Sequence, residues 1–200
     1  MVTEFFLALP AGEPLDLHHT FRCGQIFRWT QHGDTWYGPY GGGSVAVQPA
    51  EGGLTVRALG IEVQPAGLTR FLGLDASLRE VYRVLERDRW TRAAVRAVPG
   101  MRLLRQEPWE CVAGYICSQN SNIPKIELSL ERISRRWGVV HRWPEGVEVA
   151  SFPPAAALAG LSVEELWPCA LGYRCRYLIR SARQIASGEV DLEALRALPY

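Results

Sequence analysis

Asn120, Ser121 and Asn122 are three short polar side chains in a row, and such groups can bind a phosphate or the edge of a base. They lie between two stretches whose apolar residues recur at three- and four-residue spacing, as on one face of an amphipathic helix. Asn122 can cap the second helix, and Pro124 suits its first turn because no amide donor is needed there. The positive end of that helix would favour an anion, but a capped helical hairpin without a ligand has the same pattern.

Two sets of basic residues could also do chemistry. Lys125 is the only lysine among 22 lysines and arginines, so it is the only side-chain amine available for a Schiff base. Arg176, Arg180 and Arg183 recur on one side of a predicted helix at 174–187, which contains no acidic residue. Their charge and spacing suit duplex phosphates, but a solvated helix face is the simpler interpretation.

The composition is that of a globular protein, with 200 residues, 48% of them hydrophobic, 22% charged, and a net charge of +1. This small net charge gives no global basic field, so any nucleic-acid binding must depend on local patches. The N-terminus lacks the features of a signal peptide and no stretch is long enough to span a bilayer, so we expect no membrane association. The five cysteines lack the spacing of a zinc or iron–sulfur site, so we expect reduced thiols and no metal or other cofactor.

The elements that would position these residues change in type along the chain. Residues from about 21 to 58 alternate in hydrophobicity between Gly- and Pro-containing turns, which predicts an antiparallel meander. Its strands are predicted at 25–30, 35–37, 44–48 and 54–58. Helical spacing follows, and this order of a sheet before helices predicts the α+β class.

The helical part begins after Pro65. Ser162 and Glu165 form a capping box, and Pro168 must keep the helix after it short. A Pro-rich connection is predicted at 143–154. Helices are predicted at about 68–72, 77–85 and 90–98, on both sides of the Asn120–Asn122 loop, after Ser162, and at 174–187.

Three segments together resemble the 8-oxoguanine DNA glycosylases of the helix-hairpin-helix superfamily. They are Cys-Gly-Gln-Ile-Phe-Arg-Trp at 23–29, the stretch at 103–125 that ends in Cys-Ser-Gln-Asn-Ser-Asn-Ile-Pro-Lys, and Leu-Gly-Tyr-Arg-Cys-Arg-Tyr at 171–177. Their order and separations resemble the family, and the resemblance covers nearly the whole chain. It implies an N-terminal antiparallel sheet domain with helices at 1–106, followed at 107–200 by the first part of an all-α helix-hairpin-helix glycosylase domain.

The resemblance implies roles at the base opposite the lesion. A glycosylase must take the damaged base out of the stack, fill the hole and hold the orphaned partner. Asn120 matches the family's asparagine that bonds the estranged cytosine, Tyr173 matches the aromatic wedge, and Arg174 matches an arginine that donates to the cytosine. Lys125 stands where many relatives carry a second cytosine-reading arginine. Lysine lacks the planar fork, so we expect weaker discrimination for cytosine.

The resemblance also implies a site for the lesion base. Gly24 matches the residue whose carbonyl distinguishes the lesion, because 8-oxoguanine carries a hydrogen at N7 where guanine has an acceptor. Phe27 matches a position that can line the same pocket, and Asn122 can contact a phosphate. Structural roles compete with each of these: Gly24 as a bulge glycine, Phe27 as a core residue, Tyr173 as a packing residue at the start of a helix, and Asn122 as a cap.

The family's catalytic lysine, its Gly-rich hairpin and its aspartate match nothing in these 200 residues, so we expect no catalytic residue in this chain. We expect this chain alone to be inactive, with Schiff-base and lyase chemistry supplied by residues beyond it. The expected partner is double-stranded DNA with a damaged base, bound by a monomer in the cytoplasm at the nucleoid.

Other functions stay open. An alkylated-base glycosylase would share the segment at 23–29. A non-catalytic DNA-binding fragment would hold DNA nonspecifically through Asn120 and the stripe of Arg176, Arg180 and Arg183. An ordinary α+β protein would never meet DNA. The DNA-repair interpretation requires that Asn120 and Arg174 lie together on an exposed rim.

Overall fold

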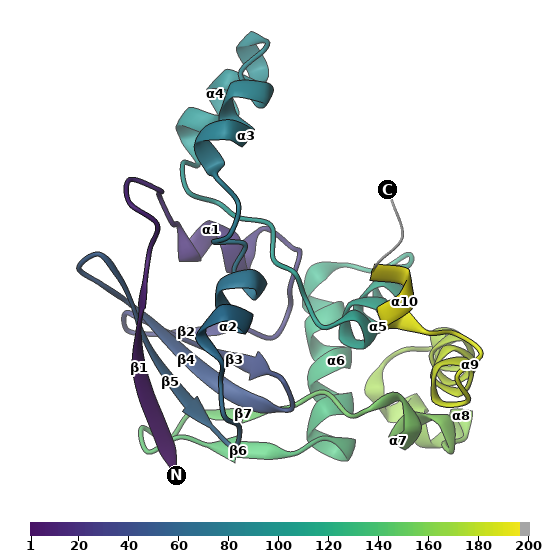
Figure 1. Ribbon diagram of the computed structural model, residues 1–200. Coiled ribbons are helices and arrows are strands. Elements are labelled where there is room, and N and C mark those ends of the chain that lie inside the picture. The colour runs from purple at the N-terminus through teal and green to yellow at the C-terminus, as the bar shows by residue number, and fades with distance from the viewer. Residues whose placement is uncertain (197–200) are drawn as a thin grey trace.

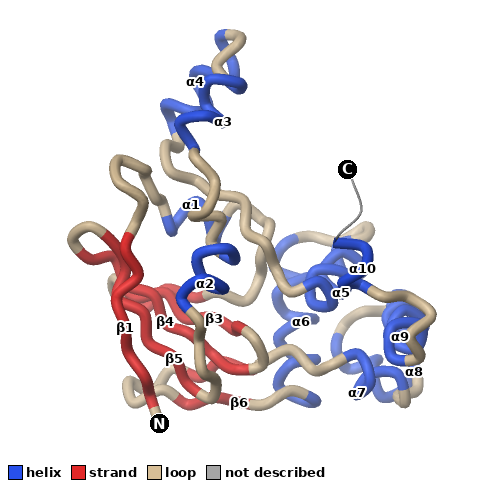
Figure 2. The backbone as a smooth tube through the Cα atoms, in the orientation of Figure 1, coloured by secondary structure: helices blue, strands red, loops and turns tan. Residues whose placement is uncertain are grey.

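The computed structural model describes residues 1–196 and begins with a five-stranded antiparallel sheet of order β1-β5-β4-β3-β2 (Figure 1, Figure 2). The predicted antiparallel meander is confirmed for β3 to β5. The first strand was not predicted; it pairs with β5 along its whole length, from Val2 opposite Leu59 to Ala8 opposite Gly53. The strands are β1 (Val2–Ala8), β2 (Thr30–His32), β3 (Thr35–Tyr40), β4 (Gly43–Ala50) and β5 (Gly53–Leu59).

One face of the sheet packs against helices α1 (Leu17–Arg22) and α2 (Pro65–Phe71). Alternate strand residues such as Val45 and Val47 point into this core, as the twofold period of a strand requires. The ring of Phe21, from α1, stacks on that of Trp29 with centroids 4.2 Å apart. This aromatic layer fixes the chain that leads from α1 into β2.

The opposite face of the sheet is covered by a hairpin from the second half of the chain, formed by β6 (Val140–Arg142) and β7 (Glu148–Ala150). Between these strands, the indole nitrogen of Trp143 donates to Ser44 Oγ of β4 at 2.9 Å. The predicted Pro-rich connection at 143–154 contains strand β7, which was not predicted. The expected domain division after residue 106 is crossed here, because the hairpin packs on the sheet of the first half. The apolar contact consists of Tyr37, Ala46, Trp143, Val147 and Val149.

The predicted strand at 25–30 is wrong. Residues 23–29 form a bent loop, and β2 begins only at Thr30. Gly24 has φ +86°, outside the strand region, and Gln25 bonds with its side chain to distant main-chain groups. The alternation around Phe27 and Trp29 arises because the loop buries Trp29 in the sheet core, while Phe27 packs against the helical core.

The helices of the second half surround a separate apolar core, which α9 joins by residues such as Leu178. The helical hairpin and the capping box are confirmed: Asn122 caps α6 by accepting from the Lys125 amide at 3.0 Å, and Ser162 and Glu165 cap each other's amides. The elements are α5 (Pro108–Ser118), α6 (Ile123–Trp137), α7 (Ala155–Ala159), α8 (Val163–Leu166), the 3-10 turn η1 (Trp167–Cys169), α9 (Arg174–Ala186) and α10 (Leu192–Arg196).

Helices α3 (Leu78–Leu85) and α4 (Arg89–Ala97) form an arm that projects away from both cores (Figure 1). Both were predicted, and both begin at a capping side chain, Ser77 and Asp88. The arm is tied down at its base, where the Tyr82 hydroxyl accepts from the Gly100 amide at 2.8 Å.

Candidate nucleic-acid interface

A small cavity opens between residues 24–27 and one face of α5 and encloses about 210 Å³. Both residues predicted to hold the lesion base, Gly24 and Phe27, line it. Four of the α5 residues in the opposite wall are spaced at i, i+3, i+4 and i+7, so they share one helix face. They are Cys111, Gly114, Tyr115 and Ser118, and Glu110 of the same helix also lines the cavity.

Gly24 is placed where only a glycine fits without strain. Its φ of +86° lies in the left-handed region, which other residues rarely adopt. A methyl group on Gly24 would lie 3.7 Å from Cδ1 of Ile123, the first residue of α6, so the cavity adjoins the loop before α6. Within residues 1–196 the Gly24 carbonyl accepts no hydrogen bond, which leaves it available to a donor from outside.

The bend that carries Gly24 is held by the amide of Gln25. Its Nε2 donates to the carbonyls of Thr20 and Arg102, both at 2.8 Å, and its Oε1 accepts from the Leu104 amide at 2.8 Å. The Gln106 side chain in turn donates to the Gln25 carbonyl. These bonds join two segments about 80 residues apart, so Gln25 positions the cavity wall rather than a ligand.

Phe27 and Arg28 attach the same bend to the helical half. The Phe27 ring lies over Gly114, where a methyl group would be 3.6 Å from Cε2. The Arg28 guanidinium contacts the Glu110 carboxylate through Nε at 2.7 Å and Nη2 at 2.6 Å, and its Nη1 donates to the Ala150 carbonyl. The Arg28 side chain is only 2% exposed. Such a buried pair orients the bend as long as both partners are present.

The loop between α5 and α6 presents Asn120 to solvent. Asn120 is exposed and has φ +46°, a left-handed conformation that asparagine tolerates better than most residues. The carbonyls of Gln119 and Asn120 point toward α9, where they accept from the Arg174 guanidinium. Arg174 Nη2 lies 2.7 Å from the Asn120 carbonyl oxygen, so the two residues lie together, which is the first half of what the DNA-repair interpretation requires.

Arg174 does not lie on an exposed rim, so the second half of the requirement fails, and the DNA-repair interpretation cannot rest on this pair of residues. Its residue exposure is 4%, because the guanidinium closes the junction by donating to carbonyls of Gln119, Asn120 and Leu171. The Arg174 side chain therefore holds the α5–α6 loop against the start of α9. Contact with a base would require it to exchange at least one of these acceptors.

Tyr173 is half exposed, at 51%, and lies directly beside the Arg174 guanidinium. The Arg174 guanidinium sits 4.7 Å from the centroid of its ring, within the range of a cation–π contact. Tyr177, one turn later, meets the same ring edge-on at 6.0 Å. The ring is thus supported from the protein side while one part of it stays open to solvent.

Asn122 and Lys125 lie at the start of α6, both exposed. The Asn122 side-chain oxygen is used by the cap, which leaves its NH₂ group free of any hydrogen bond in the described part of the chain. Lys125 forms no ion pair with any described residue. The structure therefore gathers Gly24, Phe27, Asn120, Asn122, Lys125, Tyr173 and Arg174 around the α5–α6 loop and its neighbours.

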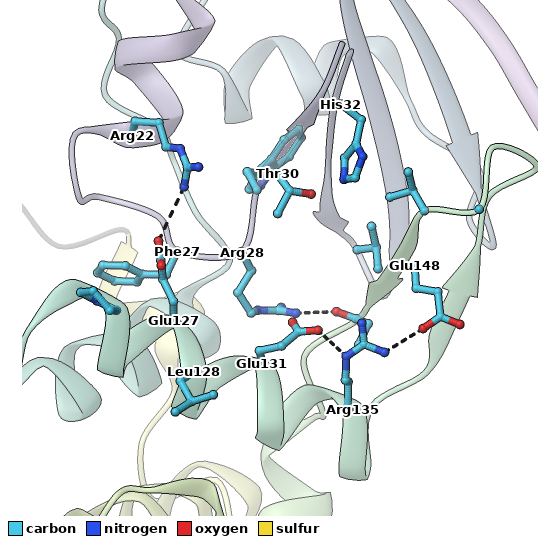
Figure 3. A pocket seen from close by; sticks show the side chains of 16 residues that line it. Arg22, Phe27, Arg28, Thr30, His32, Glu127, Leu128, Glu131, Arg135 and Glu148 are labelled. Carbon is cyan, nitrogen blue, oxygen red and sulfur yellow. Dashed lines mark hydrogen bonds and ion pairs between the residues drawn. The ribbon is translucent and has the colours of Figure 1, made fainter. Parts of the chain in front are cut away.

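A larger hollow, about 790 Å³, lies elsewhere, between α6, β2 and the β6–β7 hairpin (Figure 3). Its charged side chains neutralise one another: Arg22 pairs with Glu127, and Arg135 pairs with both Glu131 and Glu148. With its charges paired in this way, the hollow has little to recognise an ionic ligand. The smaller cavity is the better candidate for a base.

Other kinds of site find no support in residues 1–196. This part of the chain holds no cluster of three or more His, Cys, Asp or Glu able to bind a metal, and none of its helices could cross a membrane. The five cysteines are free thiols. Burial raises the pKa of the Cys117 thiol to about 12, and burial and then the Glu110 carboxylate raise the pKa of Cys111, so neither resembles an activated nucleophile.

Sequence reasoning missed several cavity residues. Cys111 and Tyr115 could have been found, because they share a helix face with Gly114 and with the polar Ser118. The Arg28–Glu110 pair has no local signal, since 82 positions separate the two residues.

Comparison with known proteins agrees with this geometry. Residues 7–112 match the family model described as "8-oxoguanine DNA glycosylase, N-terminal domain". The chain is 31% identical over 183 residues to an N-glycosylase/DNA lyase of Arabidopsis thaliana, covering 84% of this chain and 50% of that protein. It is 30% identical over 125 residues to an N-glycosylase/DNA lyase of Saccharomyces cerevisiae, covering 62% and 33%. The chain thus spans a third to a half of these relatives.

A solved structure is also similar over almost the whole chain. It is the apo-form of the 8-oxoguanine glycosylase/lyase of Clostridium acetobutylicum, with 26% identity and a TM-score of 0.87, covering 99% of this chain and 70% of that one. The shared fold includes both the sheet and the helices that surround the cavity.

Proposed function

Because residues 7–112, just over half of the 200, match the model of its N-terminal domain, the chain belongs to the 8-oxoguanine DNA glycosylase family, and we propose that it recognises 8-oxoguanine in duplex DNA. The whole protein would remove this base after extruding it from the helix. The observation that carries the proposal is the position of Gly24, which lines the cavity next to the Asn120 loop and whose carbonyl accepts no hydrogen bond within residues 1–196. The cavity would receive the extruded base, while the neighbouring Asn120 loop would enter the space that the base leaves in the duplex.

The Gly24 carbonyl supplies the chemical distinction. It would accept the N7 hydrogen of 8-oxoguanine but oppose the N7 lone pair of guanine. A mismatched polar contact of this kind costs about 1–3 kcal/mol, or roughly 5- to 150-fold in affinity. Phe27 would form an apolar wall beside the base, resting on Gly114.

Asn120, Tyr173, Lys125 and Arg174 would hold the opposite strand. The exposed Asn120 amide would bond the estranged cytosine, and the half-exposed Tyr173 ring would fill the space beside it. Lys125 would contribute a single charge, and Arg174 would reach the cytosine only by releasing a loop carbonyl. Asn122 would donate its free NH₂ to a phosphate.

Binding of matched duplexes, with 8-oxoguanine or guanine opposite cytosine, tests the proposal by fluorescence anisotropy. The chain is expected to prefer the lesion, and Gly24→Ala should abolish the preference because alanine disfavours φ +86° and would reorient the carbonyl. Gly33→Ala is the matched control: Gly33 also has positive φ, +59°, with no atom within 4 Å of an added methyl, and it lies in the β2–β3 turn. Equal affinity of the unmodified chain for both duplexes would contradict the proposal.

A further inference from the structure

Four exposed residues on the outer side of α9 alternate between aromatic and basic. They occupy positions i, i+3, i+4 and i+7, so they lie on one helix face within about 100° of one another. Tyr173 and Tyr177 are 51% and 52% exposed, and the two arginines between and after them are exposed as well. We call these residues, Tyr173, Arg176, Tyr177 and Arg180, the α9 strip.

The charge of the strip is not neutralised. Neither Arg176 nor Arg180 forms an ion pair or hydrogen bond with any residue of the described part of the chain, and α9 itself contains no acid. Buried guanidinium groups elsewhere are paired, as Arg28 is with Glu110. An exposed tyrosine ring between two unpaired arginines presents a donor hydroxyl and an apolar face within reach of both charges.

Arg183, which continues the basic spacing, does not belong to this surface. Its Nε donates to the Ala159 carbonyl at 2.8 Å and its Nη2 to that of Leu161 at 3.4 Å. The sequence-based stripe of three arginines is therefore reduced to two, and the strip extends instead toward Tyr173.

The strip starts at the candidate interface. Arg174, which follows Tyr173, donates to the Asn120 carbonyl, so the N-terminal end of α9 adjoins the loop that would enter the duplex. From Tyr173 to Arg180 the helix rises by about 10 Å, which corresponds to roughly three steps of about 3.4 Å between successive phosphates of one strand, measured along the DNA axis. Arginine and tyrosine are both frequent donors to phosphate oxygens.

We propose that the α9 strip binds the phosphate–sugar backbone of the strand that carries the unmodified partner base. This inference rests on the proposed function for its orientation, because Tyr173 and the Asn120 loop would mark the position of the orphaned nucleotide. Arg176 and Arg180 neutralise two phosphates, and the Tyr177 ring packs against the sugar between them, while Tyr173 marks the end of the strip at the orphaned nucleotide.

The test is the salt dependence of binding to an undamaged duplex, measured by anisotropy between about 50 and 200 mM salt. Each of Arg176→Ala and Arg180→Ala should reduce the magnitude of the slope of log K against log salt by about 0.9. The loss of affinity between about 50 and 200 mM salt should then be about 3.5-fold smaller for each variant than for the unmodified chain. Arg96→Ala is the matched control: it removes the same charge from the exposed arm helix α4, which projects away from the body, and should leave the slope unchanged (Figure 1).

Tyr177→Ala should weaken binding at every salt concentration without changing the slope, because no charge is lost. Unchanged slopes in both arginine variants, or an equal change in the Arg96 variant, would overturn the proposal and make the strip a solvated face. If Tyr177→Ala leaves the affinity unchanged, the tyrosine ring makes no contact with the DNA, and that part of the proposal is refuted.

These outcomes are separate from the fate of the proposed function. The undamaged duplex reports on backbone contacts alone, whereas lesion recognition is read from the preference between the two duplexes. Loss of the lesion preference with retained slope changes would leave the strip in place. Circular dichroism of each variant checks that these exposed substitutions leave the fold intact.

Discussion

The Arg28–Glu110 pair predicts an unequal response to removal of its two partners. Glu110→Ala leaves a guanidinium that is 2% exposed, beside the Phe152 ring and with the Ala150 carbonyl as its one hydrogen-bond acceptor among the described residues. An uncompensated buried charge of this kind costs about 3–5 kcal/mol. Arg28→Met leaves the Glu110 carboxylate, which is 18% exposed and borders the cavity, where water can solvate it. The main cost is then that the Ala150 carbonyl loses its hydrogen bond from Arg28, which destabilises the fold by about 1–3 kcal/mol.

Urea and thermal unfolding followed by circular dichroism would measure this difference. For a chain of this size each kcal/mol shifts Tm by about 2–4 °C, so Glu110→Ala should lower it by about 6–20 °C and Arg28→Met by clearly less. The double variant Arg28→Met, Glu110→Leu should cost no more than Arg28→Met alone, because no charge remains buried. Equal single costs, or additive costs in the double variant, would refute the reasoning.

Four further outcomes are expected. Lys125→Arg should raise the preference for cytosine over thymine or adenine opposite the lesion, since arginine adds a planar fork, and an unchanged ratio measured by anisotropy would contradict this. Borohydride treatment of the 200-residue polypeptide with lesion DNA should trap no adduct, because its one lysine is assigned to the opposite base; a trapped adduct would point to Lys125. Iodoacetamide at about pH 8 should label the exposed Cys23 and Cys111 but not Cys117, by mass spectrometry. Folding raises the pKa of the Cys117 thiol from about 8.5 in the unfolded chain to about 12. The contribution of the protonated thiol to the free energy of unfolding is therefore complete below about pH 8.5 and is lost as the pH rises toward about 12. Cys117→Ala should make the decline in stability over this alkaline range less steep.

Local signals allowed most of the helical half to be predicted. The Asn122 cap and the Ser162–Glu165 capping box depend on groups within three residues of each other, so the sequence contains the whole interaction. The same is true of the arm helices, which begin at their own capping residues. The resemblance to a family added the site residues, which no periodicity could identify.

The errors occur where distant contacts override local pattern. The alternation at 25–30 is typical of a strand, yet Gln25 bonds to Arg102, 77 positions away, and bends the chain. Arg174 was expected on the surface, but the carbonyl of Gln119, 55 positions away, draws its guanidinium inward. In both cases a polar side chain satisfies main-chain groups that no local partner reaches.

The β6–β7 hairpin has a mechanical consequence. It emerges from the helical half and is anchored on the sheet through Trp143, whose indole is fastened to Ser44. The N-terminal end of α6 carries the Asn120–Asn122 loop, which we propose enters the duplex, and its C-terminal end leads into this anchor. If the loop enters DNA, a force applied by a bending duplex at one end of α6 would be resisted by the sheet at the other end.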